Sequence, residues 1–108
     1  MSHNKVVPLN DFIRRRMMRE KAVVALNDII RRGLRSLRAE RFTRKEFARR
    51  LGMSVQSLGD IERGSRKLLA AELLLFAYAM NEAPQWVLEE ILRRFEMEIA
   101  QWRKDSGY

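Results

Sequence analysis

Apolar residues recur along this chain at spacings of three and four, and they do not alternate with polar residues over the length of a strand. Spacings of three and four place side chains on one face of an α-helix. The two prolines, Pro8 and Pro84, stand just before or at expected helix starts, where a missing N–H costs little. The pattern therefore predicts an all-α protein.

The first helical stretch is expected to begin at Asn10 or Asp11, either of which can serve as its N-cap, and to reach about residue 40. Its apolar positions drift around the helix surface, so one straight helix is not expected. We place a break near residues 18–24 or at Gly33. These apolar positions are Ile13, Met17, Val24, Ile30, Leu34 and Leu37, of which the last three should face the core.

Two short helices are predicted at the centre of the chain by their end residues. Thr43 and Glu46 have the spacing of a capping box at the start of a helix over 44–51, and Gly52 can end it in the left-handed conformation. Ser54 and Gly64 bound a second helix over 55–63 in the same way. Two short helices joined by a three-residue turn with a glycine form a helix-turn-helix unit.

Two further helices are predicted over 69–80 and 84–104. In the latter, apolar residues are spaced four, three, four and three, which is a heptad seam suited to a parallel dimer, with Glu98 and Arg103 as pairing charges. The alternative is that this face packs onto its own domain. The seam residues are Leu88, Leu92, Phe95, Ile99 and Trp102.

The side-chain inventory argues against catalysis and metal binding. The chain has no cysteine, and its single histidine is His3, so thiolate chemistry and a credible metal site are excluded and no cofactor is implied. No apolar run reaches the ~20 residues that span a bilayer, and no signal peptide is evident. We expect a cytoplasmic, nucleoid-associated protein without a membrane partner.

Charge is distributed unevenly along the chain, whose net charge is +8. Residues 31–67 carry twelve Lys and Arg against four Asp and Glu, a net of +8, while residues 68–108 carry four against seven, a net of −3. A basic centre beside an acidic tail suggests a surface that faces a polyanion, although a solvated arginine-rich surface would give the same totals.

The segment over 46–67, EFARRLGMSVQSLGDIERGSRK, resembles the helix-turn-helix family of lambda-type phage repressors and xenobiotic-response-element-like regulators. LRSLR at 34–38 resembles its first helix and PQWVL at 84–88 its closing helix, so the resemblance covers residues 34–92. In this chain, the link before the helix over 44–51 is shorter than is usual in that family and lacks the usual glycine. Phe42 is therefore expected to supply part of the packing of this link. The positions that match the family are Phe47, Ala48, Leu51, Gly52, Ser54, Leu58, Ile61, Glu62, Arg63, Gly64, Arg66, Leu73, Ala77 and Met80.

The resemblance implies a compact bundle of about five helices, with an N-terminal helical extension and a long C-terminal helix. We divide the chain into a basic N-terminal arm or helix over 1–20, a DNA-binding domain over 21–92 and a C-terminal extension over 93–108. Double-stranded DNA is the implied partner, and such repressors bind paired half-sites as homodimers.

The start of a recognition helix enters the major groove, so base contacts are expected from the helix over 55–63. Gln56 matches the donor and acceptor of adenine, and Val55 suits a thymine methyl. Asp60 suits a cytosine amine, although a salt bridge to Arg63 or Arg49 is its alternative. The predicted base-contact residues are Val55, Gln56, Ser57, Gly59 and Asp60.

Phosphate contacts should flank these base contacts and fix the docking register. The predicted residues are Arg44, Ser54, Arg63, Ser65, Arg66 and Lys67. In the family, the residue at Glu62 buttresses the fold, and Arg38 is its expected partner. A separate basic cluster of Arg14, Arg15, Arg16 and Arg19 is either a DNA-gripping arm or a solvated helix face.

The predicted function is therefore sequence-specific transcriptional regulation, with repression by occupation of an operator as the leading form. An antitoxin that covers a toxin with its C-terminal helix is one alternative, and a helical adaptor that has lost DNA binding is another. The operator, the regulated genes and any effector are not encoded in a readable pattern.

Overall fold

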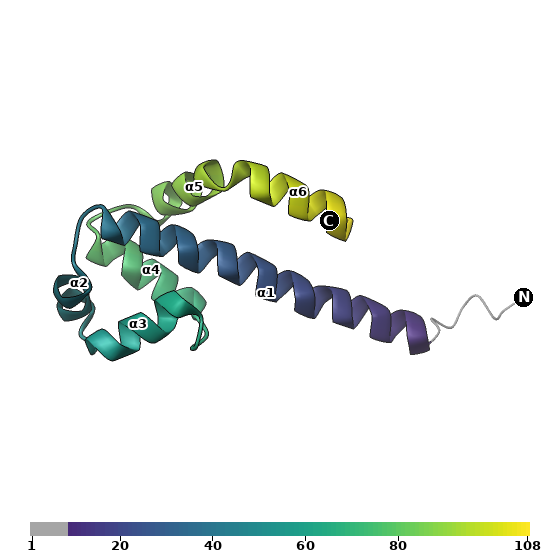
Figure 1. Ribbon diagram of the computed structural model, residues 1–108, viewed down its shortest axis with the longest axis horizontal. Helices are drawn as coiled ribbons and strands as arrows, with labels where there is room; N and C mark the ends of the chain where they lie inside the picture. The colour runs from purple at the N-terminus through teal and green to yellow at the C-terminus, as the bar shows by residue number, and fades with distance from the viewer. Residues whose placement is uncertain (1–8) are drawn as a thin grey trace, which may run out of the picture.

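The computed structural model describes residues 9–108, and this part of the chain is all-helical. Its helices are α1 (Leu9–Ala39), α2 (Arg44–Leu51), α3 (Val55–Arg63), α4 (Ala70–Ala79), α5 (Pro84–Arg94) and α6 (Glu96–Ser106) (Figure 1). The all-α prediction is confirmed over the described residues. His3 and Pro8 lie outside them.

α1 is one unbroken helix of 31 residues, about 46 Å long at the usual rise per residue. The predicted break near residues 18–24 or at Gly33 is therefore wrong. The apolar positions drift because the two halves of the helix have different surroundings: the C-terminal half lies in the bundle, and the N-terminal half projects beyond it (Figure 1). The helix begins at Leu9, so Asn10 and Asp11 lie in its first turn and do not cap it.

The ends of α2 and α3 follow the predicted local signals. Thr43 accepts a hydrogen bond from the Glu46 backbone N–H at 3.1 Å, and the Glu46 carboxylate accepts one from the Thr43 N–H at 3.2 Å. Ser54 caps α3 by accepting from the Ser57 N–H at 3.0 Å. Gly52 and Gly64 end the two helices with φ of 72° and 82°, in the left-handed region that favours glycine.

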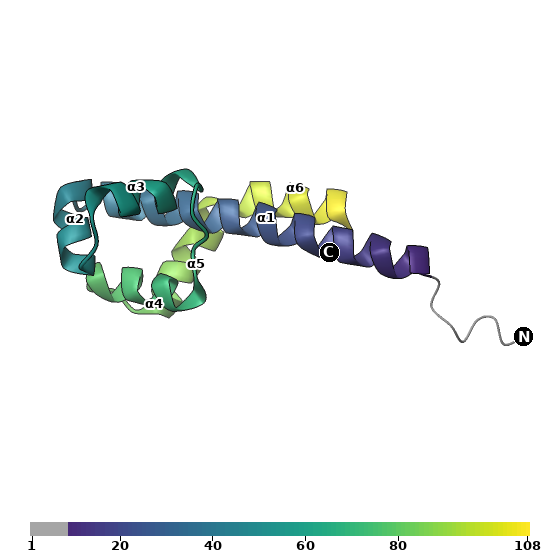
Figure 2. The ribbon, with the colours of Figure 1, turned by 90° about the horizontal axis from the view of Figure 1, so that it is seen from below.

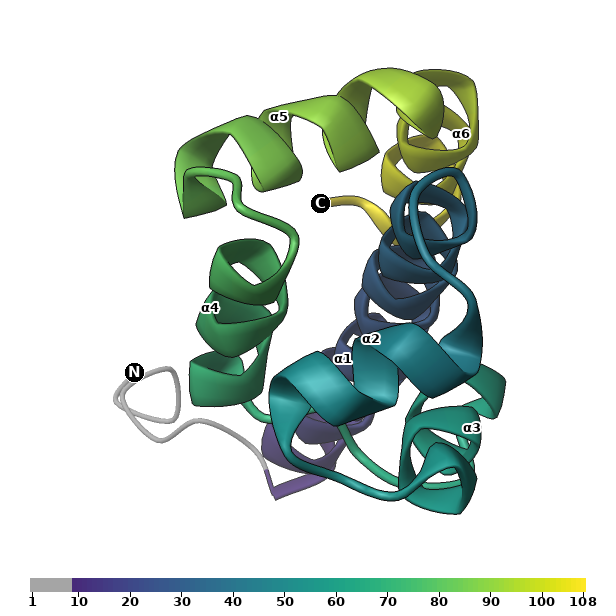
Figure 3. The same ribbon diagram turned by 90° about the vertical axis from the view of Figure 1, so that its left-hand side faces the viewer.

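The core lies between the C-terminal half of α1 and the helices α2, α3, α4 and α5. Viewed end-on, these five helices are arranged around the core (Figure 3). Its aromatic centre is Phe47, whose ring meets Phe76 edge-on at 5.5 Å and stacks against Phe42 at 5.6 Å. Phe42 therefore does fill the space beside the short link, as predicted. The buried residues of this core are Ile29, Leu34, Leu37, Phe47, Ala48, Leu58, Ile61, Phe76, Ala77, Met80, Val87 and Ile91.

The predicted single helix over 84–104 is wrong, because it is divided at Phe95 into α5 and α6. At the break, Phe95 has φ −111° and ψ 21°, and α6 turns to lie alongside α1 (Figure 2). Phe95 and Ile99 pack against the core. Glu98 forms an ion pair with Arg32 of α1, within the same chain. The residues with the predicted heptad spacing therefore lie on two helices and not on one.

A second polar link holds α5 on α1. The Arg94 guanidinium binds Ser36 Oγ on α1 at 2.9 Å, Glu40 directly after the end of α1 at 2.7 Å, and Glu90 on its own helix at 2.9 Å. Hydrogen bonds from Arg93 and Arg94 lower the pKa of the Glu90 carboxyl to about 2. Its stabilising charge is thus complete above the ordinary pKa and is lost as the pH falls through about 2.

We predict that Gly33→Ala destabilises the fold, although alanine is the better helix former. A Cβ at residue 33 would lie 2.6 Å from Cγ1 and 2.7 Å from Cγ2 of Ile91, which is itself buried in the core. Overpacking of this kind costs about 1–3 kcal/mol. Urea denaturation should show the loss of unfolding free energy.

The control is a double-mutant cycle with Ile91→Ala, which removes Cγ1 and Cγ2, the two clashing carbon atoms. Gly33→Ala should cost much less in the Ile91→Ala background than in the wild type. Equal costs in the two backgrounds would show that a Cβ at residue 33 does not clash with the Ile91 side chain.

Candidate nucleic-acid interface

α2 and α3 form one unit because the turn between them is closed by backbone and side-chain contacts. The Met53 N–H donates to the Ala48 carbonyl at 3.0 Å, and Gly52 supplies the positive φ. Ala48 and Leu58 are fully buried, which fixes α2 on α3. The predicted helix-turn-helix geometry is present.

The outward face of α3 carries most of the predicted base-contact residues. Val55 and Gln56 are exposed, and Ser57 and Asp60 are half-buried. The Gln56 amide donates to Asp60 Oδ1 at 3.2 Å, and the Arg63 guanidinium binds the same oxygen at 2.7 Å. The alternative predicted for Asp60, a salt bridge to Arg63, is therefore observed.

Gly59 differs from the other four residues because it is buried. A Cβ at this position would lie 2.8 Å from Nη1 of Arg63. The close approach that the glycine permits in this structure is thus to the side chain of the arginine one turn later in its own helix.

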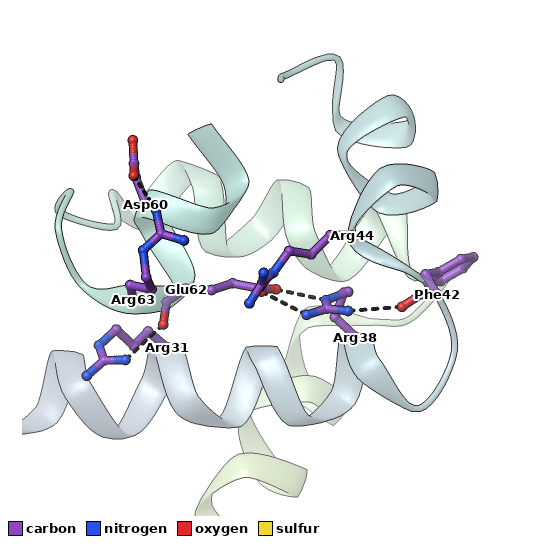
Figure 4. A network of polar contacts seen from close by, with 7 residues as sticks. All are labelled: Arg31, Arg38, Phe42, Arg44, Asp60, Glu62 and Arg63. Carbon is purple, nitrogen blue, oxygen red and sulfur yellow. Dashed lines mark hydrogen bonds and ion pairs between the residues drawn. The ribbon is translucent and has the colours of Figure 1, made fainter. Parts of the chain in front are cut away.

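Glu62 joins α3 to two other helices (Figure 4). Its carboxylate, 2% exposed, accepts hydrogen bonds from Nε and Nη2 of Arg38, both at 2.8 Å, and from Nε of Arg44 at 2.9 Å. Arg38 in turn donates to the Phe42 carbonyl at 3.1 Å, and Arg31 donates to the Glu62 carbonyl at 2.8 Å. Arg38 is the predicted partner, whereas the contributions of Arg44 and Arg31 were not predicted from the sequence.

The predicted phosphate contacts lie around both ends of α3, and several of them already have partners. Arg44 binds Glu62, Arg63 binds Asp60, and Ser54 is used as the cap. Ser65 and Lys67 are exposed beyond the C-terminal end of α3.

Arg66 forms a two-pronged pair with Glu72, at 2.7 and 3.1 Å, and this contact lowers the pKa of the Glu72 carboxyl. Glu72 also accepts the Leu69 N–H at 3.0 Å, at the start of α4. The Arg66 pair thus helps to fix the α3–α4 connection as well as placing a cation there.

Comparison with known proteins decides the family. The Helix-turn-helix family pattern matches residues 34–87, half of the chain, and the match runs from the core-facing end of α1 through α2, α3 and α4 into α5. The chain belongs to the helix-turn-helix family. No protein of curated function and no solved structure matches the chain.

The family is one of DNA-binding regulators, and the match includes every predicted base and phosphate contact. The N-terminal part of α1 and all of α6 lie outside the match. The basic cluster at Arg14, Arg15, Arg16 and Arg19 belongs to that N-terminal part, which extends away from α3 (Figure 1). Two of its arginines, Arg14 and Arg15, bind Asp11, and Arg16 binds Glu20.

Residues 9–108 hold no group of three or more histidine, cysteine, aspartate or glutamate side chains placed to bind a metal. None of the helices in that range combines the length and apolar character that a membrane span requires.

We predict that Glu62→Gln destabilises the protein by about 3–5 kcal/mol, the usual cost of leaving a buried charge without its partner. The substitution keeps the shape of the side chain but removes the charge that neutralises Arg38. Thermal or urea unfolding of the purified protein measures the loss.

Asp60→Asn is the matched control on the same helix, because it removes a pair whose two members are more exposed and should cost less than about 1 kcal/mol. A loss for Glu62→Gln no larger than that of the control would mean that Arg38 is hydrated and that its ion pair does not hold α3 on α1.

Proposed function

We propose that this protein is a sequence-specific transcriptional regulator that inserts α3 into the major groove of double-stranded DNA and represses by occupying its operator. The observation that carries the proposal is the α2–α3 unit, whose outward residues Val55, Gln56 and Asp60 lie within the family match. Binding of operator DNA would place the protein in the cytoplasm, at the nucleoid.

Gln56 and Val55 are the proposed base readers. Both are exposed in the first turn of α3, the part of a recognition helix that reaches base edges. The Gln56 amide rests on Asp60 in the free protein, so reading an adenine exchanges one exposed hydrogen bond at 3.2 Å for two to the base. Ser57 and Asp60 complete the proposed base-contact surface. Gly59, which has no Cβ, leaves room for the Arg63 side chain beside that surface.

The proposed phosphate contacts are Arg44, Ser54, Arg63, Ser65, Arg66 and Lys67. They flank the exposed face of α3, and the part of the chain from 31 to 67 has a net charge of +8. Phosphate groups then compete with Glu62 for Arg44, with Asp60 for Arg63 and with Glu72 for Arg66. Lys67 is exposed, so it is the simplest of these phosphate contacts to test.

We prefer repression to the antitoxin role, because repression requires only DNA binding by α3, whereas an antitoxin also requires a toxin as a second protein. Co-purification with a small toxin would favour the antitoxin instead. A helical adaptor would bind no DNA at all, and a gel-shift at moderate salt separates it from both.

We predict that Gln56→Ala lowers affinity for the preferred site about tenfold to a hundredfold, because one bidentate base contact contributes ~1–3 kcal/mol of discrimination. Affinity for scrambled DNA should barely change, because no phosphate contact is lost. Titrations of wild type and variant on both DNAs at one salt concentration measure this. Equal losses on the two DNAs would show that Gln56 does not read a base.

We predict that Lys67→Ala weakens binding to all sequences by a similar factor and lowers the slope of log affinity against log salt by about one. Lys21→Ala is the matched control, because Lys21 is an exposed lysine on α1, outside the family match. A change in sequence preference with an unchanged salt slope would contradict the phosphate role of Lys67.

A further inference from the structure

The N-terminal half of α1 has an apolar face that no other part of the described chain covers. Phe12, Ile13, Met17, Val23 and Val24 are 45–71% exposed. Residues 12–13 and residues 23–24 share this face because eleven residues make three helical turns. Between the two apolar pairs, on the same face, lie Arg16 and Glu20, which are also exposed.

This face continues into a groove of about 780 Å³ between α1 and the α3–α4 connection. Its apolar lining includes Val23 and Val24 on one side and Leu68 and Leu69 on the other. Val24 and Leu69, which both line this groove, are 71% and 59% exposed, so its apolar side chains are open to solvent.

We propose that this face, here named the α1 arm face (residues 12–24), pairs with the same face of a second copy of the chain in antiparallel orientation. Residues 12–13 of each copy pack against residues 23–24 of the other, so that each copy inserts Phe12 into the groove of the other. The two contacts are equivalent by two-fold symmetry, as in most homodimers.

The charges on the α1 arm face select this orientation and this occupant. When residues 12–13 face residues 23–24 of the second copy, Arg16 of each copy lies opposite Glu20 of the other. A parallel, in-register pair would instead put Arg16 against Arg16 and Glu20 against Glu20. Like charges in direct opposition disfavour pairing, so the charges at positions 16 and 20 favour the antiparallel over the parallel orientation.

The predicted C-terminal seam is a poorer surface for the same purpose. Phe95 and Ile99 are taken up by the core, and the helix that would carry the seam is divided at Phe95. Only Leu88 and Leu92 of that set remain classed as exposed. A dimer through the α1 arm face would extend the proposed function, because it would present two α3 helices to paired half-sites.

The first experiment measures the mass in solution of the full chain by sedimentation equilibrium. The wild type should be a dimer at micromolar concentration, and Val24→Glu should weaken self-association roughly tenfold or more, because it buries an unpaired charge in the pair. Leu92→Glu, on the C-terminal seam, should leave the dimer intact. A monomeric wild type, or a dimer that only Leu92→Glu dissociates, would overturn the proposal.

The register is tested by cysteines, which the natural chain lacks. A mixture of Ile13→Cys protein and Val23→Cys protein should form a mixed disulfide on mild oxidation, in preference to either self-linked dimer. Self-linked Ile13→Cys dimers as the main product would indicate parallel pairing, and no linkage in any mixture would exclude the α1 arm face.

Charge reversal gives a third, independent readout. Arg16→Glu protein and Glu20→Arg protein should each self-associate weakly, because positions 16 and 20 then carry like charges, and the two variants should pair with each other when mixed. Absence of this mixed dimer would contradict the charge pairing.

Failure of the proposed dimer is distinguishable from failure of DNA binding. Ile13→Glu, on the same α1 arm face, should also dissociate the dimer but should retain its circular dichroism spectrum and its affinity for a single half-site in a gel-shift, because residue 13 does not line the groove that Arg63, Arg66 and Lys67 line. It should lose only the preference for paired half-sites. A wild-type dimer that binds no DNA would leave the α1 arm face standing and would overturn the function.

Discussion

The Glu62 carboxylate fixes the position of α3, because it is almost fully buried and must be neutralised by other residues inside the protein. Arg38 of α1 supplies two of the hydrogen bonds, Arg44 of α2 a third, and Arg31 of α1 holds the backbone carbonyl of the same residue (Figure 4). A buried ion pair contributes little net stability compared with apolar packing, but breaking it is costly. It therefore acts mainly to fix one arrangement of α1, α2 and α3, which is what a DNA-reading surface requires.

The same ion pairing limits how much of the basic centre is available to DNA. Arg38 is buried and Arg44 shares Glu62, while Arg63 and Arg66 are held by Asp60 and Glu72. The net charge of this region is thus a better guide to the long-range field that attracts DNA than to the number of contacts made on arrival. The Arg63–Asp60 pair is the most exposed of these and is weak, so phosphate can displace its carboxylate.

The two halves of the continuous helix α1 have different roles. Its C-terminal half provides Leu34 and Leu37 to the core, and its N-terminal half carries exposed apolar side chains beyond the bundle. α6 runs beside it, joined through the Arg32–Glu98 ion pair and the Arg32 contact with the Phe95 ring at 5.1 Å. The helix therefore connects the DNA-reading unit to the α1 arm face, and a second copy bound at that face would set the distance between two α3 helices.

The sequence by itself determined the features that depend on neighbouring residues. The capping box at Thr43, the glycines that end α2 and α3, and the order of core positions through Ile61 are local signals, because each is satisfied within one or two helical turns. The outward face of α3 follows from the same periodicity. The Arg38–Glu62 pair was also predictable, since the resemblance to the helix-turn-helix family implies a buttressing role for the residue at Glu62.

Only the tertiary structure decided the rest, because it depends on residues far apart in the chain. The division at Phe95 arises where the C-terminal segment turns to meet α1, and Glu98 finds Arg32 across 66 positions of sequence. A heptad spacing reads the same whether its face meets a second chain or its own domain. In the same way, the continuity of α1 and the pairing of Arg44 with Glu62 depend on which neighbours the folded chain supplies, and local spacing carries no information about those neighbours.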